Sequence, residues 1–180
     1  MDDIAPKSQR VYGASMTPYG VYLFARTYGL NADALGAVSL PGMSDHPRRL
    51  LYFQALEHFF RCHLLLNGKT PEEVRNYNHD FEKMLDDSKF FGLVIPKAVE
   101  AFIRLRSVAR DYTRIRYDFR LDDPNDPTQR PPPMTQMQRA VRTLEKAVGR
   151  AIEASNPDCI VLDGNKFTMI AGSANFKAWS

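Results

Sequence analysis

The stretch LLYFQALEHFFRCHLLLNG, residues 50–68, decides the fold class of this chain. Apolar side chains recur in it at intervals of three and four residues and cover a wide arc, which is the pattern of a helix with neighbours on several sides. Ser44 or Asp45 can cap the start of this helix, and Gly68 suits the position just beyond its end. We therefore expect a central, buried helix here.

A first helix is predicted before this stretch. Thr17 can cap it, and Pro18 fits its first position. The helix ends at Gly29 or continues to Leu35, because a glycine lowers helix propensity without forbidding a helix. Residues 1–16 are predicted to form an irregular arm.

Further helices are predicted after the central one. Thr70 and Glu73 form a capping box, which opens a short helix that ends near Tyr77. Asn78 is the predicted cap of the next helix, and Pro96 opens another that runs into an arginine-rich segment. The side chains expected to face the core from these helices are Phe81, Met84, Leu85, Val99, Phe102, Ile103 and Leu105.

The end of the chain changes character. Residues 121–133 are rich in proline and predict a surface loop, and Thr135 with Gln138 forms a second capping box. The last long helix carries a narrow apolar seam, interpreted as core, with a dimer face as the alternative: Met137, Val141, Leu144, Val148, Ala151 and Ile152. Residues 156–180 are predicted to hold a short β-hairpin.

These segments predict an all-α fold: an up-and-down bundle of about five helices over residues 17–155, in a single domain of residues 1–180. Hydrophobic residues make up 44% of the chain, which is enough for such a core. No apolar run approaches the roughly 18 residues that span a bilayer, and the polar N-terminus lacks the pattern of a secretory signal. We expect a cytoplasmic protein that does not enter a membrane.

Motifs for a cofactor, a metal or an activated nucleophile are missing from the sequence. Cys62 and Cys159 are far apart and lack metal-ligand spacing, so neither a disulfide nor a metal site is expected. No glycine-rich phosphate loop and no nucleophile elbow is present, so no cofactor is predicted. His79, at a predicted helix start, is retained with Arg110 as a candidate for a catalytic role.

The basic charge of the chain is concentrated in residues 104–120. This segment carries six arginines and two aspartates, 6 − 2 = +4, whereas the whole chain carries 24 − 21 = +3. We therefore expect an anionic ligand to bind here first. The six arginines are Arg104, Arg106, Arg110, Arg114, Arg116 and Arg120.

Two interpretations of this segment are open. Arg106, Arg110 and Arg114 are spaced by four, so they share one face if the helix continues. A guanidinium can hold a phosphate through two hydrogen bonds, and an interleaved tyrosine such as Tyr112 or Tyr117 can stack on a base, which suits a nucleotide or RNA. The alternative is that the arginines pair with carboxylates and hold the helices together.

Three segments together resemble a known family. They are YFQALEHFFRCHLLLNG (52–68), NHDFEKML (78–85) and IRYD (115–118), followed by a loop and a closing helix over 135–154. They resemble the HEPN superfamily (higher eukaryote and prokaryote nucleotide-binding), whose members are small all-helical bundles that commonly dimerise. The resemblance implies the same fold and a homodimer for this chain.

One departure from the family pattern concerns activity. Ribonucleases of the family carry an arginine followed a few positions later by a histidine, but no histidine follows His79 in this chain, and Tyr117 stands seven positions after Arg110. Tyrosine, with a pKa near 10, is a poor general base at neutral pH. Arg116 and Tyr117 are instead similar to the Arg-Tyr pair of a family branch thought to bind nucleotides or partners without cleaving RNA.

Three hypotheses follow from these observations. The first is a non-catalytic HEPN-like module that dimerises and binds a nucleotide, RNA or a partner protein. Its binding residues would be Arg110, Arg114, Arg116 and Tyr117. The second is a divergent ribonuclease in which Arg110 stabilises the phosphate and His79 acts as the base. The third is a structural or interaction protein whose arginines are internal ion-pair partners.

Overall fold

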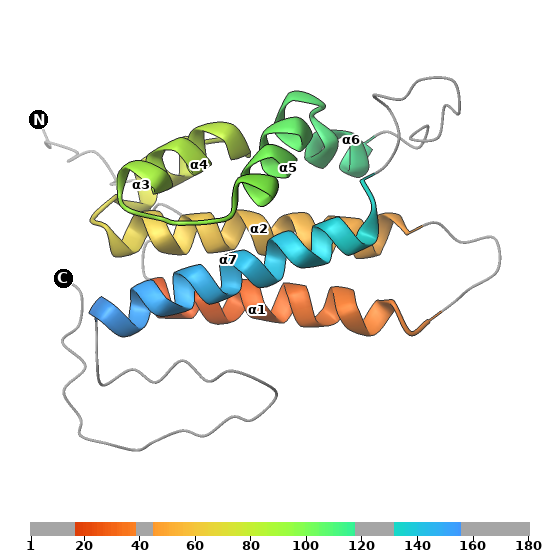
Figure 1. Cartoon of the computed structure of the whole chain (residues 1–180), viewed down its shortest axis with the longest axis horizontal. Helices are drawn as coiled ribbons and strands as arrows, with labels where there is room; N and C mark the ends of the chain where they lie inside the picture. Colours follow the sequence, from red (N-terminus) through yellow and green to blue (C-terminus); the bar gives the residue numbers. More distant parts are fainter. Residues whose placement is uncertain (1–16, 39–44, 118–131, 156–180) are drawn as a thin grey trace, which may run out of the picture.

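The computed structural model of the chain describes residues 17–38, 45–117 and 132–155, and every regular element in these ranges is a helix (Figure 1). The all-α fold class is therefore confirmed for the described part of the chain. The predicted hairpin in 156–180 and most of the predicted loop over 121–133 lie outside the described residues. The helices are α1 (Pro18–Leu35), α2 (His46–Leu66), α3 (Pro71–Arg75), α4 (Phe81–Phe90), α5 (Lys97–Val108), α6 (Asp111–Tyr117) and α7 (Met134–Ser155).

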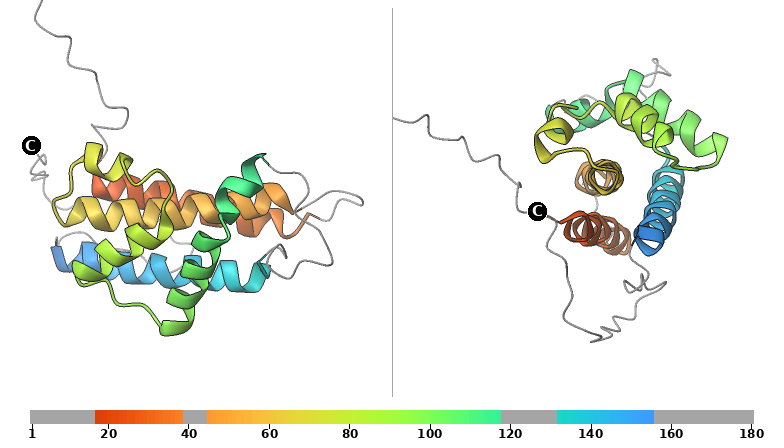
Figure 2. Two further views of the ribbon diagram at one scale, coloured as in Figure 1. Left: turned by 90° about the horizontal axis from the view of Figure 1, so that it is seen from above. Right: turned by 90° about the vertical axis from the view of Figure 1, so that its left-hand side faces the viewer.

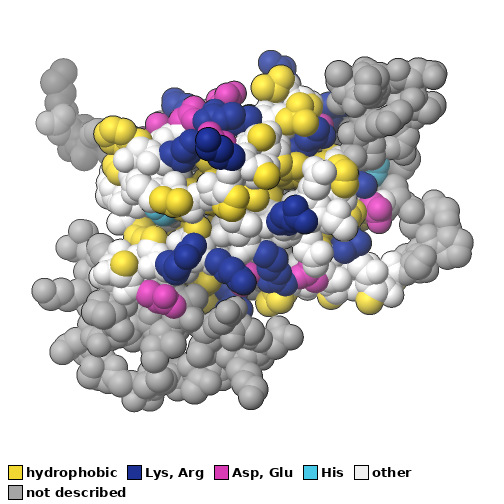
Figure 3. Space-filling view, in the orientation of Figure 1, with side chains coloured by type: hydrophobic (Ala, Val, Ile, Leu, Met, Phe, Trp, Pro, Cys, Tyr) yellow, Lys and Arg dark blue, Asp and Glu magenta, His cyan; other side chains and the backbone are white. Residues whose placement is uncertain are grey.

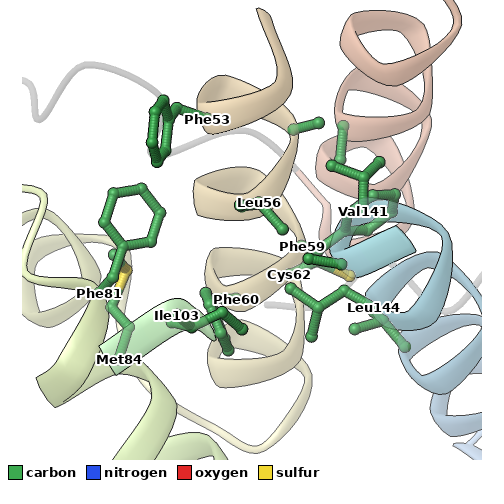
Figure 4. Close-up of a cluster of buried hydrophobic side chains, with 14 of the residues drawn as sticks. Phe53, Leu56, Phe59, Phe60, Cys62, Phe81, Met84, Ile103, Val141 and Leu144 are labelled. Carbon is green, nitrogen blue, oxygen red and sulfur yellow. The ribbon is translucent and has the colours of Figure 1, made fainter. Parts of the chain in front are cut away.

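The central helix is α2, as the sequence predicts. Seen end-on, it lies between α1 and α7 on one side and the shorter helices on the other (Figure 2). Its buried apolar residues are Tyr52, Phe53, Ala55, Leu56, Phe59, Phe60, Cys62 and Leu64. Several of them pack against Phe81, Met84, Ile103, Val141 and Leu144 of the surrounding helices (Figure 4). Pro47 is the only exposed residue of α2, so the helix is covered on almost all sides, and this burial of its wide apolar arc stabilises it.

Helix α1 runs antiparallel to α2. The sequence left two possible ends for it, Gly29 and Leu35, and the structure shows the longer helix. Thr17 Oγ1 accepts the backbone N–H of Gly20 at 3.0 Å, as expected of a cap. The helix continues through Gly29 to Leu35. A Cβ added at Gly29 would lie 3.1 Å from Cγ1 of Val141, so the glycine serves the close approach of α1 to α7.

The connection from α3 to α4 agrees with one prediction and corrects another. Thr70 and Glu73 form the predicted capping box, with hydrogen bonds of 3.2 and 2.7 Å, although α3 ends two residues before the predicted end. Asn78 is not the cap of α4, because Asn78 and His79 both adopt left-handed backbone conformations. Asp80 caps the helix instead, and its Oδ1 accepts the N–H of the third helical residue at 3.0 Å.

Two predictions about α5 and α7 are wrong. Leu105 is 56% exposed, because it lies two residues after buried Ile103 and so points about 200° away around the helix. Helix α7 begins at Met134, one residue before the predicted cap Thr135. Gln138 therefore does not complete a capping box, and its side-chain amide reaches α1 instead.

The apolar seam of α7 belongs to the core of a single chain. Met137, Val141, Leu144, Val148 and Ile152 are all at most 4% exposed, whereas Ala151 is half-buried. They pack on α1, α2 and α5. The interpretation of this seam as core is confirmed, and these side chains are not available for a dimer face.

Candidate functional site

The arginine-rich segment is not one continuous helix. α5 ends and α6 begins on either side of Arg110, whose backbone φ of 52° lies in the left-handed region. The turn is tied to α4, because the Ser107 hydroxyl accepts the backbone N–H of Glu82 at 3.2 Å. Arg106, Arg110 and Arg114 are expected to share one face only if the helix continues, and that condition is not met. The left-handed residue at Arg110 interrupts the helical spacing, so the three arginines do not lie on one helix.

A pocket of about 490 Å³ opens at this break, between the start of α4, the end of α5 and the start of α6. Its size is within the range of small-molecule sites. The lining includes His79 and Arg110, which come from distant parts of the sequence, together with Arg106, Ser107 and Tyr112. His79 and Arg110, the two candidates for a catalytic role in the sequence analysis, therefore line the same pocket.

A buried carboxylate holds His79 in this pocket. Nδ1 of His79 lies 3.0 Å from both carboxylate oxygens of Glu57, and Glu57 is only 1% exposed. Arg61, one helical turn further along α2, also contacts this carboxylate, at 2.5 Å. Because Nδ1 faces Glu57, Nε2 is the ring nitrogen left for a ligand, and the His79 side chain is 38% exposed.

Tyr112 lines the pocket next to His79. Its ring centroid lies 4.8 Å from that of His79, and its hydroxyl accepts a hydrogen bond from the Gln54 amide. Burial, and next the negative charge of Glu57, raise the pKa of Tyr112 above its ordinary value, so it stays a neutral phenol. The guanidinium of Arg116 lies 5.6 Å from the centroid of the same ring, within cation–π range.

Two of the arginines are held by carboxylates. Arg104 contacts Glu82, Asp86 and Glu100, so it links α5 to α4. Arg106 lies 2.8 Å from Asp111 across the break between α5 and α6. For these two arginines the ion-pair interpretation of the sequence is confirmed.

The four residues proposed for ligand binding have different positions. Arg110 is exposed, and among the described residues its guanidinium has no hydrogen bond or ion pair. Arg114 is half-buried near Asp111, and Arg116 is exposed beside the Tyr112 ring. Neither Arg114 nor Arg116 lines the pocket. Tyr117 is the last residue of α6, and its side chain lies outside the description.

Glu57 is the site residue that sequence reasoning missed. It stands between Leu56 and His58 in a helix whose other buried residues, apart from His63, are apolar. A carboxylate in such a position needs partners, because an unpaired buried charge is strongly unfavourable. That single acidic residue was the signal in the sequence for a polar site on the central helix.

Comparisons with family models, with curated proteins and with solved structures found no match for this chain. Within the ranges that the structure describes, no group of three or more histidine, cysteine or acidic side chains is placed to hold a metal ion. No helix in those ranges is long and apolar enough to cross a membrane.

Proposed function

We propose that this chain is a HEPN-like module that binds a nucleotide or RNA through phosphate, at the pocket between α4, α5 and α6. One observation carries the proposal: the exposed guanidinium of Arg110, without a partner among the described residues, shares a pocket with the His79 imidazole and the Tyr112 ring. A guanidinium binds phosphate through two parallel hydrogen bonds. The imidazole supplies a further donor or acceptor at Nε2.

The acidic residues of the pocket lining do not oppose this assignment. Asp80 caps α4 through the backbone N–H of Lys83, and Glu82 contacts Arg104. Both carboxylates are therefore occupied by interactions within the fold. Arg106 adds a second guanidinium to the lining, although it already forms an ion pair with Asp111.

The HEPN resemblance supports the same proposal. Arg116 and Tyr117, which are similar to the Arg-Tyr pair of the non-cleaving branch, both belong to α6, and the Arg116 guanidinium lies beside the ring of the pocket residue Tyr112. The resemblance also implies a homodimer, and size-exclusion chromatography with light scattering tests that implication independently of ligand binding.

The binding test compares Arg110→Gln with Arg75→Gln. Arg75 is also exposed and forms no ion pair with any described residue, but it lies on α3 and outside the pocket. The two variants change the net charge equally. We expect Arg110→Gln to weaken binding of a fluorescein-labelled RNA 12-mer, measured by anisotropy, by about tenfold or more, which is about 1.4 kcal/mol. The logarithm of the association constant decreases linearly with the logarithm of the salt concentration, and in Arg110→Gln the steepness of this line should fall by about one.

Equal weakening by the two variants would place binding outside this pocket. Absence of measurable binding of RNA and of a fluorescent ATP analogue at low salt would reject the function itself.

A divergent ribonuclease is the second candidate, and the contact between Glu57 and His79 favours it. This contact orients a histidine beside Arg110, although the sequence lacks the histidine expected after that arginine. A ribonuclease of this kind would lose RNA cleavage in His79→Gln. Cleavage that survives in this variant would remove His79 from the mechanism, and absence of cleavage in the wild type would remove the activity.

A further inference from the structure

A second pocket, of about 310 Å³, lies at a different place in the molecule, between the last turns of α2, the segment after α4, and the second half of α7. It shares no lining residue with the pocket at Arg110. His63 of α2 lines it, and α7 supplies Ala147 and Arg150. Leu93 and Val94 complete an apolar side.

The His63 side chain is buried without a hydrogen-bond partner. It is only 3% exposed, and no described residue forms a hydrogen bond with either ring nitrogen. Its Nδ1 is fully buried and unpaired. Buried polar groups in folded proteins are nearly always hydrogen-bonded, so an unpaired imidazole lining a pocket indicates a partner from outside the fold.

The charge of this pocket comes from Arg150. Basic side chains gather over α7 (Figure 3). Arg150, on this helix, is exposed and forms no ion pair with any described residue. Burial lowers the pKa of His63 to about 4, so the imidazole is neutral near pH 7 and adds no charge. The pocket therefore presents one cation, one neutral hydrogen-bonding ring and an apolar side.

We propose that this pocket binds a small organic monocarboxylate with an apolar body and a hydroxyl or carbonyl group near the carboxylate. Arg150 pairs with the carboxylate, the His63 ring bonds the neighbouring polar group, and Leu93 and Val94 contact the hydrocarbon. Val94 is 80% exposed and Leu93 is 5% exposed, so the apolar side extends from the interior to the rim. A guanidinium pairs with a carboxylate through two parallel hydrogen bonds, and the apolar side of the pocket suits a hydrocarbon body. The proposal is independent of nucleotide or RNA binding at the other pocket.

The test uses the full chain, with salicylate as the probe and salicylamide as its neutral counterpart. We expect salicylate to shift the His63 ring resonances in a ¹H–¹⁵N long-range spectrum and to bind at least tenfold more tightly than salicylamide. Arg150→Gln should weaken salicylate binding about tenfold or more. Arg139→Gln is the matched control, because Arg139 is also exposed on α7 but does not line the pocket. Ala147→Leu should abolish binding by filling the cavity.

Three results would overturn the proposal. The first is that salicylate does not shift the His63 resonances at concentrations on the order of 10 mM, a limit that corresponds to negligible affinity. The second is equal binding of salicylate and salicylamide. The third is an equal effect of Arg150→Gln and Arg139→Gln. The wild-type spectra decide the first two points even if Ala147→Leu fails to fold.

Discussion

Acidification from pH 7 to pH 5 should destabilise this protein through His63. The pKa of this buried imidazole is about 4 in the folded chain, because burial disfavours the charged ring, whereas an unfolded chain has a histidine pKa of about 6.5. Between these values the unfolded state binds more protons than the folded state. The stability is therefore intact above pH 6.5 and is lost progressively as the pH falls toward 4.

The size of the effect follows from the two pKa values. At pH 5 the unfolded histidine is almost fully protonated and the folded one is not, so linkage gives a loss of about 2 kcal/mol relative to pH 7. Urea unfolding followed by circular dichroism at both pH values measures this loss. The informative quantity is the difference between wild type and His63→Leu, because other titrating groups contribute equally to both proteins.

Cys62→Ala is a suitable control, since Cys62 is the adjacent residue, is fully buried, and has a thiol pKa that burial raises further above this pH range. We expect the control to lower stability by a similar amount at both pH values and to keep the wild-type dependence on pH. His63→Leu should remove about 2 kcal/mol of that dependence. An unchanged dependence on pH in His63→Leu would show that His63 is not buried in the neutral form.

Three further predictions concern stability, each measured by urea unfolding. Leu144→Ala, at a fully buried position of α7, should cost about 2–5 kcal/mol, whereas Leu105→Ala, at an exposed position of α5, should cost below about 0.5 kcal/mol; similar losses at the two positions would contradict the assigned core. Gly68→Ala should cost about 1–2 kcal/mol because the φ of Gly68 is 87°, and Gly68→Asn should cost less, so equal costs would refute a left-handed turn there. Glu57→Gln should cost about 1–3 kcal/mol, because it leaves Arg61 and the His79 ring without their carboxylate; an unchanged midpoint would show that the contact is not formed.

Much of the helical core could be predicted from the sequence. The apolar spacing of α2 predicted its central position, and the capping residues Thr17 and Thr70 marked helix starts that the structure confirms. Errors occurred where local signals compete. Asn78 is a good capping residue by type, but the chain turns left-handed at this position, and the cap falls to Asp80.

The candidate site could be predicted only in part. The sequence predicts Arg110 and His79 as candidate site residues, but their spacing in the chain does not show that they share a pocket. Arg104 and Arg110 look alike in a charge count, but one contacts three carboxylates and the other is exposed without an ion pair among the described residues. The carboxylates of Glu82 and Asp86 are 22 and 18 residues away from Arg104 in sequence, so only packing brings them together.

The sequence by itself determined an all-helical core around residues 50–68 and a concentration of positive charge in residues 104–120. Both can be read from the sequence because periodicity and composition are local properties of a chain. The tertiary structure decided where that charged segment bends and which carboxylates come within reach of its guanidinium groups. It also placed the buried Glu57 against His79, which is 22 residues further along the chain, and left His63 without a hydrogen-bond partner in a second pocket. Ion pairing and burial depend on which helices meet, and that is a property of the folded molecule.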